Sequence, residues 1–280
     1  MSSILHPPHA AVREAVSRAL AEDLGPLGDL TAGLVPEGSR GRGAFVARQE
    51  GVIAGSRCAI EAFAQVDPTT KVDWVADDGT DVHPGEVIGR VDGFLAGVLT
   101  AERTALNFLC HLSGVATLTR RFVRATHGRA RIWDTRKTTP GLRALEKAAV
   151  RAGGGVNHRG SLSDFVLVKD NHLAGLTITE AVRRAKMRWP GRTIEVECEN
   201  LEQVHEAVAA GAGLVLLDNM SPDRVTEAVA VIRGRVTVEV SGGITLDGVG
   251  AYADTGADLI SVGALTNSAP NLDIGLDLEI

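Results

Sequence analysis

The fold is decided by one stretch in the second half of the chain, Gly211-Ala212-Gly213-Leu214-Val215-Leu216-Leu217-Asp218-Asn219. Its first glycine suits the end of a helix, the apolar run suits a short buried strand, and the polar pair Asp218-Asn219 ends that strand. The same joint recurs at Gly256-Ala257-Asp258-Leu259. Two copies of one helix-to-strand joint predict a parallel sheet covered by helices.

Strands and helices alternate on both sides of this stretch. The expected strands cover residues 131–134, 165–169, 194–198, 214–218, 236–240 and 259–262. Amphipathic helices are expected near 141–152, 177–189, 201–210, 222–233 and 246–255. A run of such units suits an open or incomplete α/β barrel, or a doubly wound sheet.

The first part of the chain follows a different pattern. A helix is expected over residues 9–24, ending at Gly25, and another near 57–66. Strand-like runs separated by glycine turns cover 43–49, 52–54, 71–76 and 86–91, which indicates an α+β block with antiparallel pairing. Residues 100–126 are expected to be helical, with a break near Ser113-Gly114.

The composition excludes several classes of protein. Of 280 residues, 44% are hydrophobic and 23% are charged, which is unlike disordered or collagen-like chains. No uncharged apolar run approaches the ~18 residues that a membrane span needs, and residues 1–8 lack the basic and apolar regions of a secretory signal. The three cysteines are far apart and form no CxxC pair, so we expect neither a disulfide framework nor a zinc site, and we expect a cytoplasmic protein.

The charge is unevenly distributed. The net charge is −6, which makes nucleic acid a poor candidate partner. Residues 129–169 nevertheless carry nine lysines and arginines against three acids, and such a local basic patch favours a small anionic ligand. The spacing of Arg143, Lys147 and Arg151 is typical of a solvated helix face. The cations that remain as ligand candidates are Arg136, Lys137, Arg159 and Lys169.

Polar residues or glycines follow nearly every expected strand. In parallel α/β folds the carboxyl ends of the strands meet at one edge and hold the ligand. Glycine turns that precede a helix direct backbone N–H groups at an anion, so Ser241-Gly242-Gly243 and Val262-Gly263-Ala264 indicate a phosphate site. The other strand-end candidates are Thr135, Arg136, Lys137, Lys169, Glu197 and Asp218.

The two sides of this expected site suit different ligands. Arginines hold planar carboxylates and lysines act as point charges, so the basic side suits a substrate rich in carboxylate. Glu197 and Asp218 beside a phosphate site suit sugar hydroxyls or Mg²⁺, although pairing with the nearby lysines explains them equally. We therefore expect transfer of a phosphorylated sugar, or chemistry on a sugar phosphate.

Several motifs are those of a known family. The chain contains Asp134-Thr135-Arg136-Lys137-Thr138-Thr139-Pro140, Asn157-His158-Arg159 and Lys169-Asp170-Asn171-His172. It also contains Glu102-Arg103-Thr104-Ala105-Leu106-Asn107 and the ending Asp273-Ile274-Gly275-Leu276-Asp277. In these motifs, and over essentially its whole length, the chain resembles quinolinate phosphoribosyltransferase, the decarboxylating nicotinate-nucleotide pyrophosphorylase of NAD biosynthesis.

The resemblance implies a fold and an activity. It implies an N-terminal α+β sandwich domain over 1–112, joined by the C-terminal tail 267–280, and an open, incomplete α/β barrel with mostly parallel strands over 113–266. The implied reaction transfers phosphoribosyl from phosphoribosyl pyrophosphate to quinolinate with decarboxylation and needs Mg²⁺. The implied assembly is a homodimer or higher homo-oligomer in which Arg103 reaches the neighbour's site.

The resemblance also divides the site residues. The quinolinate side is implied to contain Arg136, His158, Arg159 and Lys169. The phosphoribosyl side is implied to contain Lys137, Glu197, Asp218, Ser241, Gly242, Gly243, Val262, Gly263 and Ala264, with Thr135 as a further substrate-binding candidate. The residues expected to act in catalysis are Lys137, Lys169, Glu197 and Asp218. One departure is visible at Gly160-Ser161, because the family often has the glycine one place later.

Three other interpretations compete with this one. A nicotinate phosphoribosyltransferase would need fewer carboxylate-binding cations than the chain supplies. A barrel lyase or aldolase would use Lys169 as a Schiff-base amine, which leaves the acids Glu197 and Asp218 and the Thr-Arg-Lys turn unexplained. A non-catalytic relative would bind a phosphoribosyl ligand without turnover, and the sequence leaves that interpretation open.

Overall fold

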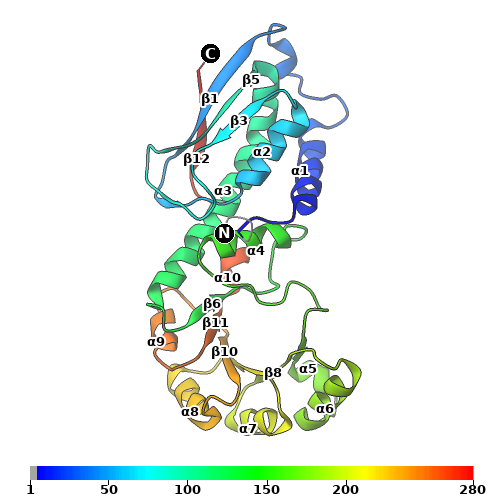
Figure 1. Ribbon diagram of the computed structural model, residues 1–280, viewed down its shortest axis with the longest axis vertical. Coiled ribbons are helices and arrows are strands. Elements are labelled where there is room, and N and C mark those ends of the chain that lie inside the picture. Colours follow the sequence, from blue (N-terminus) through cyan, green and yellow to red (C-terminus); the bar gives the residue numbers. More distant parts are fainter. Residues whose placement is uncertain (1–4, 280) are drawn as a thin grey trace. The chain divides into compact units, whose positions relative to one another are not determined.

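The computed structural model describes residues 5–279, so residues 1–4 of the segment in which no secretory signal is expected lie outside the described residues. The described chain divides into two compact units (Figure 1). The first contains the chain up to Arg120, Thr138–Gly154 and the residues from Ala264 onward, and the second contains Arg121–Lys137 and Gly155–Gly263. Among the described residues, no helix combines the length and the apolar character needed to cross a membrane.

The first unit is built on an antiparallel four-stranded sheet in the order β12-β1-β5-β3. Its strands are β1 (Arg40–Ala47), β3 (Lys71–Trp74), β5 (Val87–Phe94) and β12 (Ile274–Glu279), while β2 (Gly51–Val52) pairs with β4 (Asp81–Val82). The helices are α1 (His9–Leu24), the 3-10 helix η2 (Ala32–Leu34), α2 (Ser56–Val66), α4 (Arg143–Ala152), α10 (Ala264–Asn267) and most of α3 (Leu95–Ala125). The expected α+β block with antiparallel pairing is confirmed.

The core of the first unit lies between this sheet and its helices. Phe45 of β1 is fully buried, and its ring lies 5.9 Å from Phe63 of α2 and 5.4 Å from Trp74 of β3. Strand β12 pairs antiparallel with β1, so the end of the chain completes a sheet that the beginning of the chain starts. The segment 138–154 joins this unit partly through the buried Glu146, which accepts one hydrogen bond from the backbone N–H of Thr139 and contacts His111 of α3 at 2.8 Å.

The predicted break in the long helix is wrong, because α3 runs without interruption from Leu95 to Ala125. Gly114 allows a close approach instead: a Cβ at this position would lie 2.0 Å from the backbone oxygen of Pro270. Ser113 is buried and exchanges hydrogen bonds with the backbone N–H and C=O of Ala54. Lys147 on α4 is also buried, so the helix face predicted to be solvated is only partly so.

The second unit is an open parallel sheet of six strands in the order β6-β11-β10-β9-β8-β7. The strands are β6 (Arg131–Trp133), β7 (Val166–Val168), β8 (Ile194–Cys198), β9 (Leu214–Asp218), β10 (Thr237–Ser241) and β11 (Leu259–Ser261). The helices are α5 (Asp170–Leu173), α6 (Ile178–Arg188), α7 (Leu201–Ala210), α8 (Pro222–Ile232) and α9 (Val249–Ala253). The predicted open, incomplete α/β architecture with parallel strands is therefore confirmed.

The two faces of this parallel sheet differ in chemistry. Successive residues of a strand point to opposite faces, and one face carries fully buried apolar residues such as Val196, Leu217 and Val240. On the opposite face Glu197, Leu216 and Glu239 lie in register on β8, β9 and β10. These three residues of the second face line the functional site described below.

Candidate active site

A cavity of about 570 Å³ lies at the carboxyl ends of the strands in the second unit. The loop after β6 contributes Thr135, Arg136 and Lys137, and the segment before β7 contributes His158 and Arg159. Lys169 follows β7, while Glu197, Asp218 and Ser241 come from the ends of β8, β9 and β10. The predicted gathering of strand-end side chains in one pocket is thus what the fold produces.

One part of the pocket is strongly basic. Arg136, Lys137, Arg159 and Lys169 all line it. Burial, and then the charge of the neighbouring Arg136, lower the pKa of Arg159, while Glu195 and other nearby acids oppose this shift. Two guanidinium groups close enough to repel each other favour an anionic ligand between or beside them.

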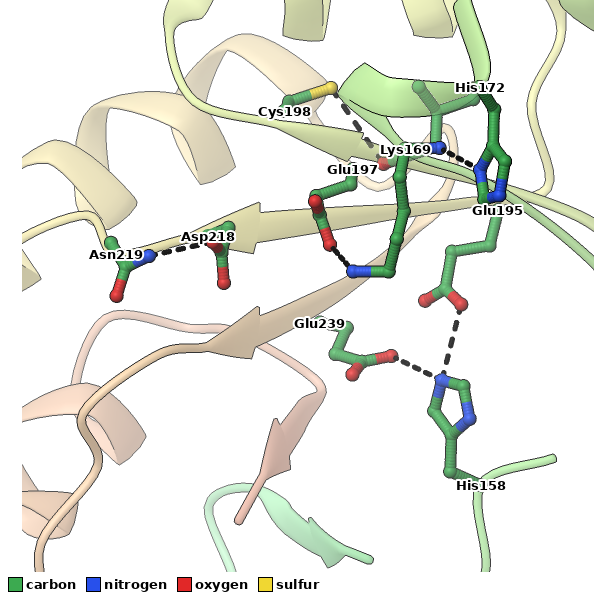
Figure 2. Close-up of polar contacts among 10 residues, drawn as sticks. His158, Lys169, His172, Glu195, Glu197, Cys198, Asp218, Asn219 and Glu239 are labelled. Carbon is green, nitrogen blue, oxygen red and sulfur yellow. Dashed lines mark hydrogen bonds and ion pairs between the residues drawn. The ribbon is translucent and has the colours of Figure 1, made fainter. Parts of the chain in front are cut away.

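The acidic part of the pocket comes from β8 and β9. Glu197 is partly buried, and its carboxylate forms a hydrogen-bonded ion pair with the ammonium of Lys169, as Figure 2 shows. Asp218 accepts a hydrogen bond of 2.7 Å from the side-chain amide of Asn219. The sequence left two roles open for these acids, sugar or Mg²⁺ binding and pairing with a lysine, and Glu197 is paired with Lys169.

The glycine turn after β10 is shaped by close backbone contact. Gly242 has φ +99°, and a Cβ there would lie 2.2 Å from the side-chain oxygen of Asn219. Asn219 itself has a left-handed backbone with φ 54°, and its N–H donates to the carbonyl of Ser241. The turns after β9 and β10 therefore fit together only because position 242 has no side chain.

His158, Glu195 and Glu239 form a buried cluster, and His158 and Glu239 also line the pocket. The Nε2 atom of His158 lies 3.2 Å from a carboxylate oxygen of Glu195 and 3.4 Å from one of Glu239 (Figure 2). The two glutamates are 0% and 1% exposed. The Nδ1 atom of His158 accepts a hydrogen bond of 2.8 Å from the backbone N–H of Arg159. Protein groups therefore occupy both ring nitrogens.

Burial controls the protonation of this cluster. It raises the pKa of Glu195 to about 8. At Glu239 burial also acts to raise the pKa, but hydrogen bonds with His158, Glu195 and Ser261 and the charge of His158 together outweigh it and lower the pKa of that carboxyl. Burial lowers the pKa of His158, but hydrogen bonds to the two glutamates dominate and raise it to about 9. The Arg159 N–H that points at Nδ1 opposes a proton on that atom. In the neutral and the charged ring alike, Nε2 carries a hydrogen toward the carboxylates.

The loop that carries Arg159 is anchored on both sides. Asp134, which is fully buried, accepts 2.8 Å and 2.7 Å hydrogen bonds from the backbone of His158 and the side chain of Asn157. Asp164 accepts from the backbone N–H of Gly160 at 2.7 Å and from the hydroxyl of Ser161 at 2.6 Å. The departure at Gly160-Ser161 thus keeps a closed, hydrogen-bonded loop.

Some predicted site residues lie elsewhere, and others were missed. Val262, Gly263 and Ala264 do not line the cavity, to which β11 contributes Ser261. Arg103 lies on α3 in the first unit, with its side chain exposed. Glu239 and Asn219 line the pocket although the sequence did not single them out as site residues. No local signal marks Glu239, because it takes a polar position in the ordinary alternation Thr-Val-Glu-Val-Ser of β10.

The fold and the site together define a class of enzyme. A parallel sheet whose carboxyl edge combines a basic cluster, two carboxylates and a glycine turn is built to join an anionic acceptor to a phosphorylated sugar, as a phosphoribosyltransferase does. The family described as "Quinolinate phosphoribosyl transferase" matches through its N-terminal domain over residues 29–113 and its C-terminal domain over residues 115–277. The chain belongs to this family and is a pentosyltransferase.

Individual relatives are similar over almost the whole chain. The "Nicotinate-nucleotide pyrophosphorylase [carboxylating]" of Mycobacterium leprae is 44% identical over 276 residues, covering 96% of this chain and 97% of its own. The "Probable nicotinate-nucleotide pyrophosphorylase [carboxylating]" of Bacillus subtilis is 41% identical over 275 residues, covering 97% and 95%. The solved structure of the nicotinate-nucleotide pyrophosphorylase from Francisella tularensis superimposes with a TM-score of 0.94, at 39% identity and 99% coverage of both chains.

Proposed function

We propose that this chain transfers the phosphoribosyl group of phosphoribosyl pyrophosphate to quinolinate with loss of CO₂, giving nicotinate mononucleotide and pyrophosphate. The observation that carries the proposal is that one pocket contains both a cluster of cations and two acids. The cations are Arg136, Arg159 and Lys169, and the acids are Glu197 and Asp218. Quinolinate carries two carboxylates, and a nicotinate site would need fewer cations. The family names given to the relatives support the same reaction.

The basic cluster orients the acceptor. Arg136 and Arg159 bind carboxylates through paired N–H donors, and Lys169 adds a point charge. His158 shapes this side of the pocket. When both carboxylates are held, the pyridine nitrogen has one direction in which to point, and a fixed attack geometry is worth up to about 7–11 kcal/mol.

The reaction proceeds in two steps. The nitrogen lone pair forms a bond to C1 of the ribose while the C1–O bond to pyrophosphate breaks, and the electron pair leaves with pyrophosphate. The ring nitrogen is then positive, so it accepts the electrons of the C2–carboxylate bond as CO₂ leaves. A proton replaces the lost group at C2. No covalent bond to the protein is needed.

The acidic groups serve the sugar side of this reaction. Glu197 and Asp218 accept hydrogen bonds from ribose hydroxyls, and their charge favours the cationic character that develops at C1. Lys137 and the backbone N–H groups of the Ser241-Gly242-Gly243 turn bind the phosphate oxygens.

Mg²⁺ fits this donor set. The carboxylate oxygens of Glu197 and Asp218 are hard ligands in a partly open pocket, which suits a cation that keeps several waters and binds mainly through substrate phosphates. Bound in this way, Mg²⁺ supplies charge that offsets the departing pyrophosphate.

The assembly and the compartment are part of the proposal. Arg103 is exposed on α3, where a second copy of the chain can receive it, so we infer a homodimer with shared sites. Cys58, Cys110 and Cys198 are all unpaired, which suits the reducing cytoplasm.

A paired assay tests the function. Purified protein receives phosphoribosyl pyrophosphate and Mg²⁺ with either quinolinate or nicotinate, and CO₂ and pyrophosphate are followed together. The expected result is turnover with quinolinate alone, with equal amounts of both products. Turnover with nicotinate would reassign the acceptor, and binding without turnover of either would indicate a non-catalytic relative.

A further inference from the structure

The buried cluster of His158, Glu195 and Glu239 has no role in the proposed chemistry as it stands. Glu195 lies on β8 and Glu239 on β10, with β9 between them, and both reach the same imidazole nitrogen. Both carboxyl groups are almost completely buried. They therefore cannot both grip a substrate directly, and the cluster must act mainly through His158.

The fold itself does not require charges at these positions. Leu216 and Leu259 are the register partners of Glu239 on β9 and β11, and Leu214 is the partner of Glu195. The same face of the sheet is thus closed by leucine at adjacent positions. Burying two carboxyl groups is costly compared with burying apolar side chains of similar size. Because burying these two carboxyl groups costs free energy, a role in the functional site explains them better than a role in packing the core does.

The cluster is not arranged as a metal site. The ligand atoms of the three residues lie within 4.8 Å of one another, which is close enough for a shared cation. However, Nδ1 of His158 faces the backbone N–H of Arg159 and Nε2 faces the two carboxyl groups, so the hydrogen of a neutral ring lies on Nε2. While Nε2 carries that hydrogen, its lone pair is not available to a metal. The geometry is that of a donor held between two acceptors.

His158 in turn controls the neighbouring arginine. Its Nδ1 atom accepts a hydrogen bond from the backbone N–H of Arg159. The centroid of its ring lies 4.9 Å from that of Trp133 and 5.0 Å from that of Phe165. The guanidinium of Arg159 lies over the same Phe165 ring at 5.9 Å. The imidazole thus holds the backbone at Arg159 and packs against the Phe165 ring that the guanidinium covers. The rotation of the imidazole is in turn set by the acceptors that face Nε2.

We infer that Glu195 and Glu239 are positioning residues for the acceptor substrate. They fix the ring of His158 through its Nε2–H, and the ring fixes Arg159 where it meets a carboxylate. His158 lines the pocket itself and also acts through Arg159. This inference rests on the proposed function, because Arg159 is taken to hold quinolinate.

Steady-state kinetics of Glu195→Gln and Glu239→Gln test the inference. Each variant keeps the side-chain shape and replaces one carboxyl group by an amide. We expect KM for quinolinate to rise about tenfold and KM for phosphoribosyl pyrophosphate to change less than about twofold, since only the placement of Arg159 is lost. Glu202→Gln makes the same chemical change at an exposed position on α7 and serves as the matched control.

A double-mutant cycle separates positioning from general damage. In an Arg159→Ala background, Glu239→Gln should cause no further rise in KM for quinolinate, because the group that it positions is gone. Full additivity of the two effects would overturn the inference, and so would an unchanged KM for quinolinate in folded Glu→Gln variants.

Nitrogen NMR of the wild-type protein, labelled at histidine, gives a readout that does not depend on turnover or on the folding of any glutamate variant. We expect Nε2 of His158 to carry a hydrogen in the charged and the neutral ring alike, because it faces the two carboxyl groups. A neutral ring with its hydrogen on Nδ1 would contradict the inference. If quinolinate is not a substrate, the wild-type assay fails while this measurement still succeeds, so failure of the proposed function is distinguishable from failure of the inference.

Discussion

Lys169 and Glu197 form an ion pair across the neighbouring strands β7 and β8, and this pair joins the two halves of the pocket. Lys169 is assigned to the acceptor side and Glu197 to the sugar side. Each of the two side chains neutralises the other. We therefore expect bound quinolinate to draw Lys169 away from Glu197, which would leave the carboxylate available to a ribose hydroxyl.

Glu197→Gln should change the affinities for quinolinate and for phosphoribosyl pyrophosphate in opposite directions. Removing the carboxylate frees Lys169, so quinolinate measured alone by calorimetry should bind more tightly. Lys169 is 40% exposed, and such a pair is worth at most about 1 kcal/mol, or about fivefold in affinity. Phosphoribosyl pyrophosphate should bind more weakly. Equal weakening of both ligands would contradict the assigned division of the pocket.

Arg136→Ala should lower kcat/KM for quinolinate by about a hundredfold, because a substrate carboxylate left unpaired in the pocket costs about 3 kcal/mol. Arg136→Lys keeps the charge but loses the forked donor geometry, so it should recover only part of the loss. Unchanged kcat/KM in Arg136→Ala would place the substrate elsewhere.

Gly242→Ala and Gly243→Ala form a matched pair. Both positions have left-handed backbones, with φ of +99° and +61°, but only a Cβ at 242 meets Asn219. Strain alone costs about 1 kcal/mol at either position. We expect Gly242→Ala to lose stability by a further 1–3 kcal/mol, estimated roughly from overpacking, and to raise KM for phosphoribosyl pyrophosphate. Similar melting temperatures for the two variants would contradict the close contact.

The stability of the protein should depend on pH through Glu195. Burial raises the pKa of this carboxyl from 4.5 to about 8, so the folded chain keeps a proton that the unfolded chain releases above its ordinary pKa. The stabilisation is complete below pH ~4.5 and is lost as the pH rises to about 8, at no more than about 1.4 kcal/mol per pH unit. Thermal melting from pH 5 to 9 should therefore show a smaller decline in Glu195→Gln. If the melting temperatures of the wild type and of Glu195→Gln decline equally with pH, the raised pKa of Glu195 would be refuted.

Hybrid dimers test whether Arg103 acts on the neighbouring site. Arg103→Ala and Lys169→Ala should each be nearly inactive alone. When equal amounts are dissociated and mixed, half of the dimers are hybrids with one intact site each, so about a quarter of the wild-type activity should return. Recovery should be absent if Arg103 acts within its own subunit, even where mass spectrometry demonstrates hybrid dimers.

Local patterns predicted most of the second unit. The strand 214–218 and the helix 201–210 were predicted with the observed bounds, since short apolar runs and glycine helix ends leave little choice. The end strand β12 was not recognised as a strand, because pairing with a strand more than 200 residues earlier leaves no local signal.

The site residues at the ends of strands could be predicted from the sequence, whereas those buried within a strand could not. Position alone pointed to Arg136, Glu197 and Asp218. Glu239 was missed because a buried acid within a strand gains its meaning only from a partner, here His158, that is distant in the sequence. Gly114 was misinterpreted for a similar reason, since its neighbour Pro270 belongs to the end of the chain.

The alternation along strand β8 has an evolutionary consequence. Val196 is buried between Glu195 and Glu197 in sequence but belongs to the opposite face of the sheet. A substitution at Val196 therefore alters the core, whereas one at Glu195 or Glu197 alters the face that carries the site. Selection can thus act on adjacent codons separately, for a stable scaffold at one and for chemistry at the next.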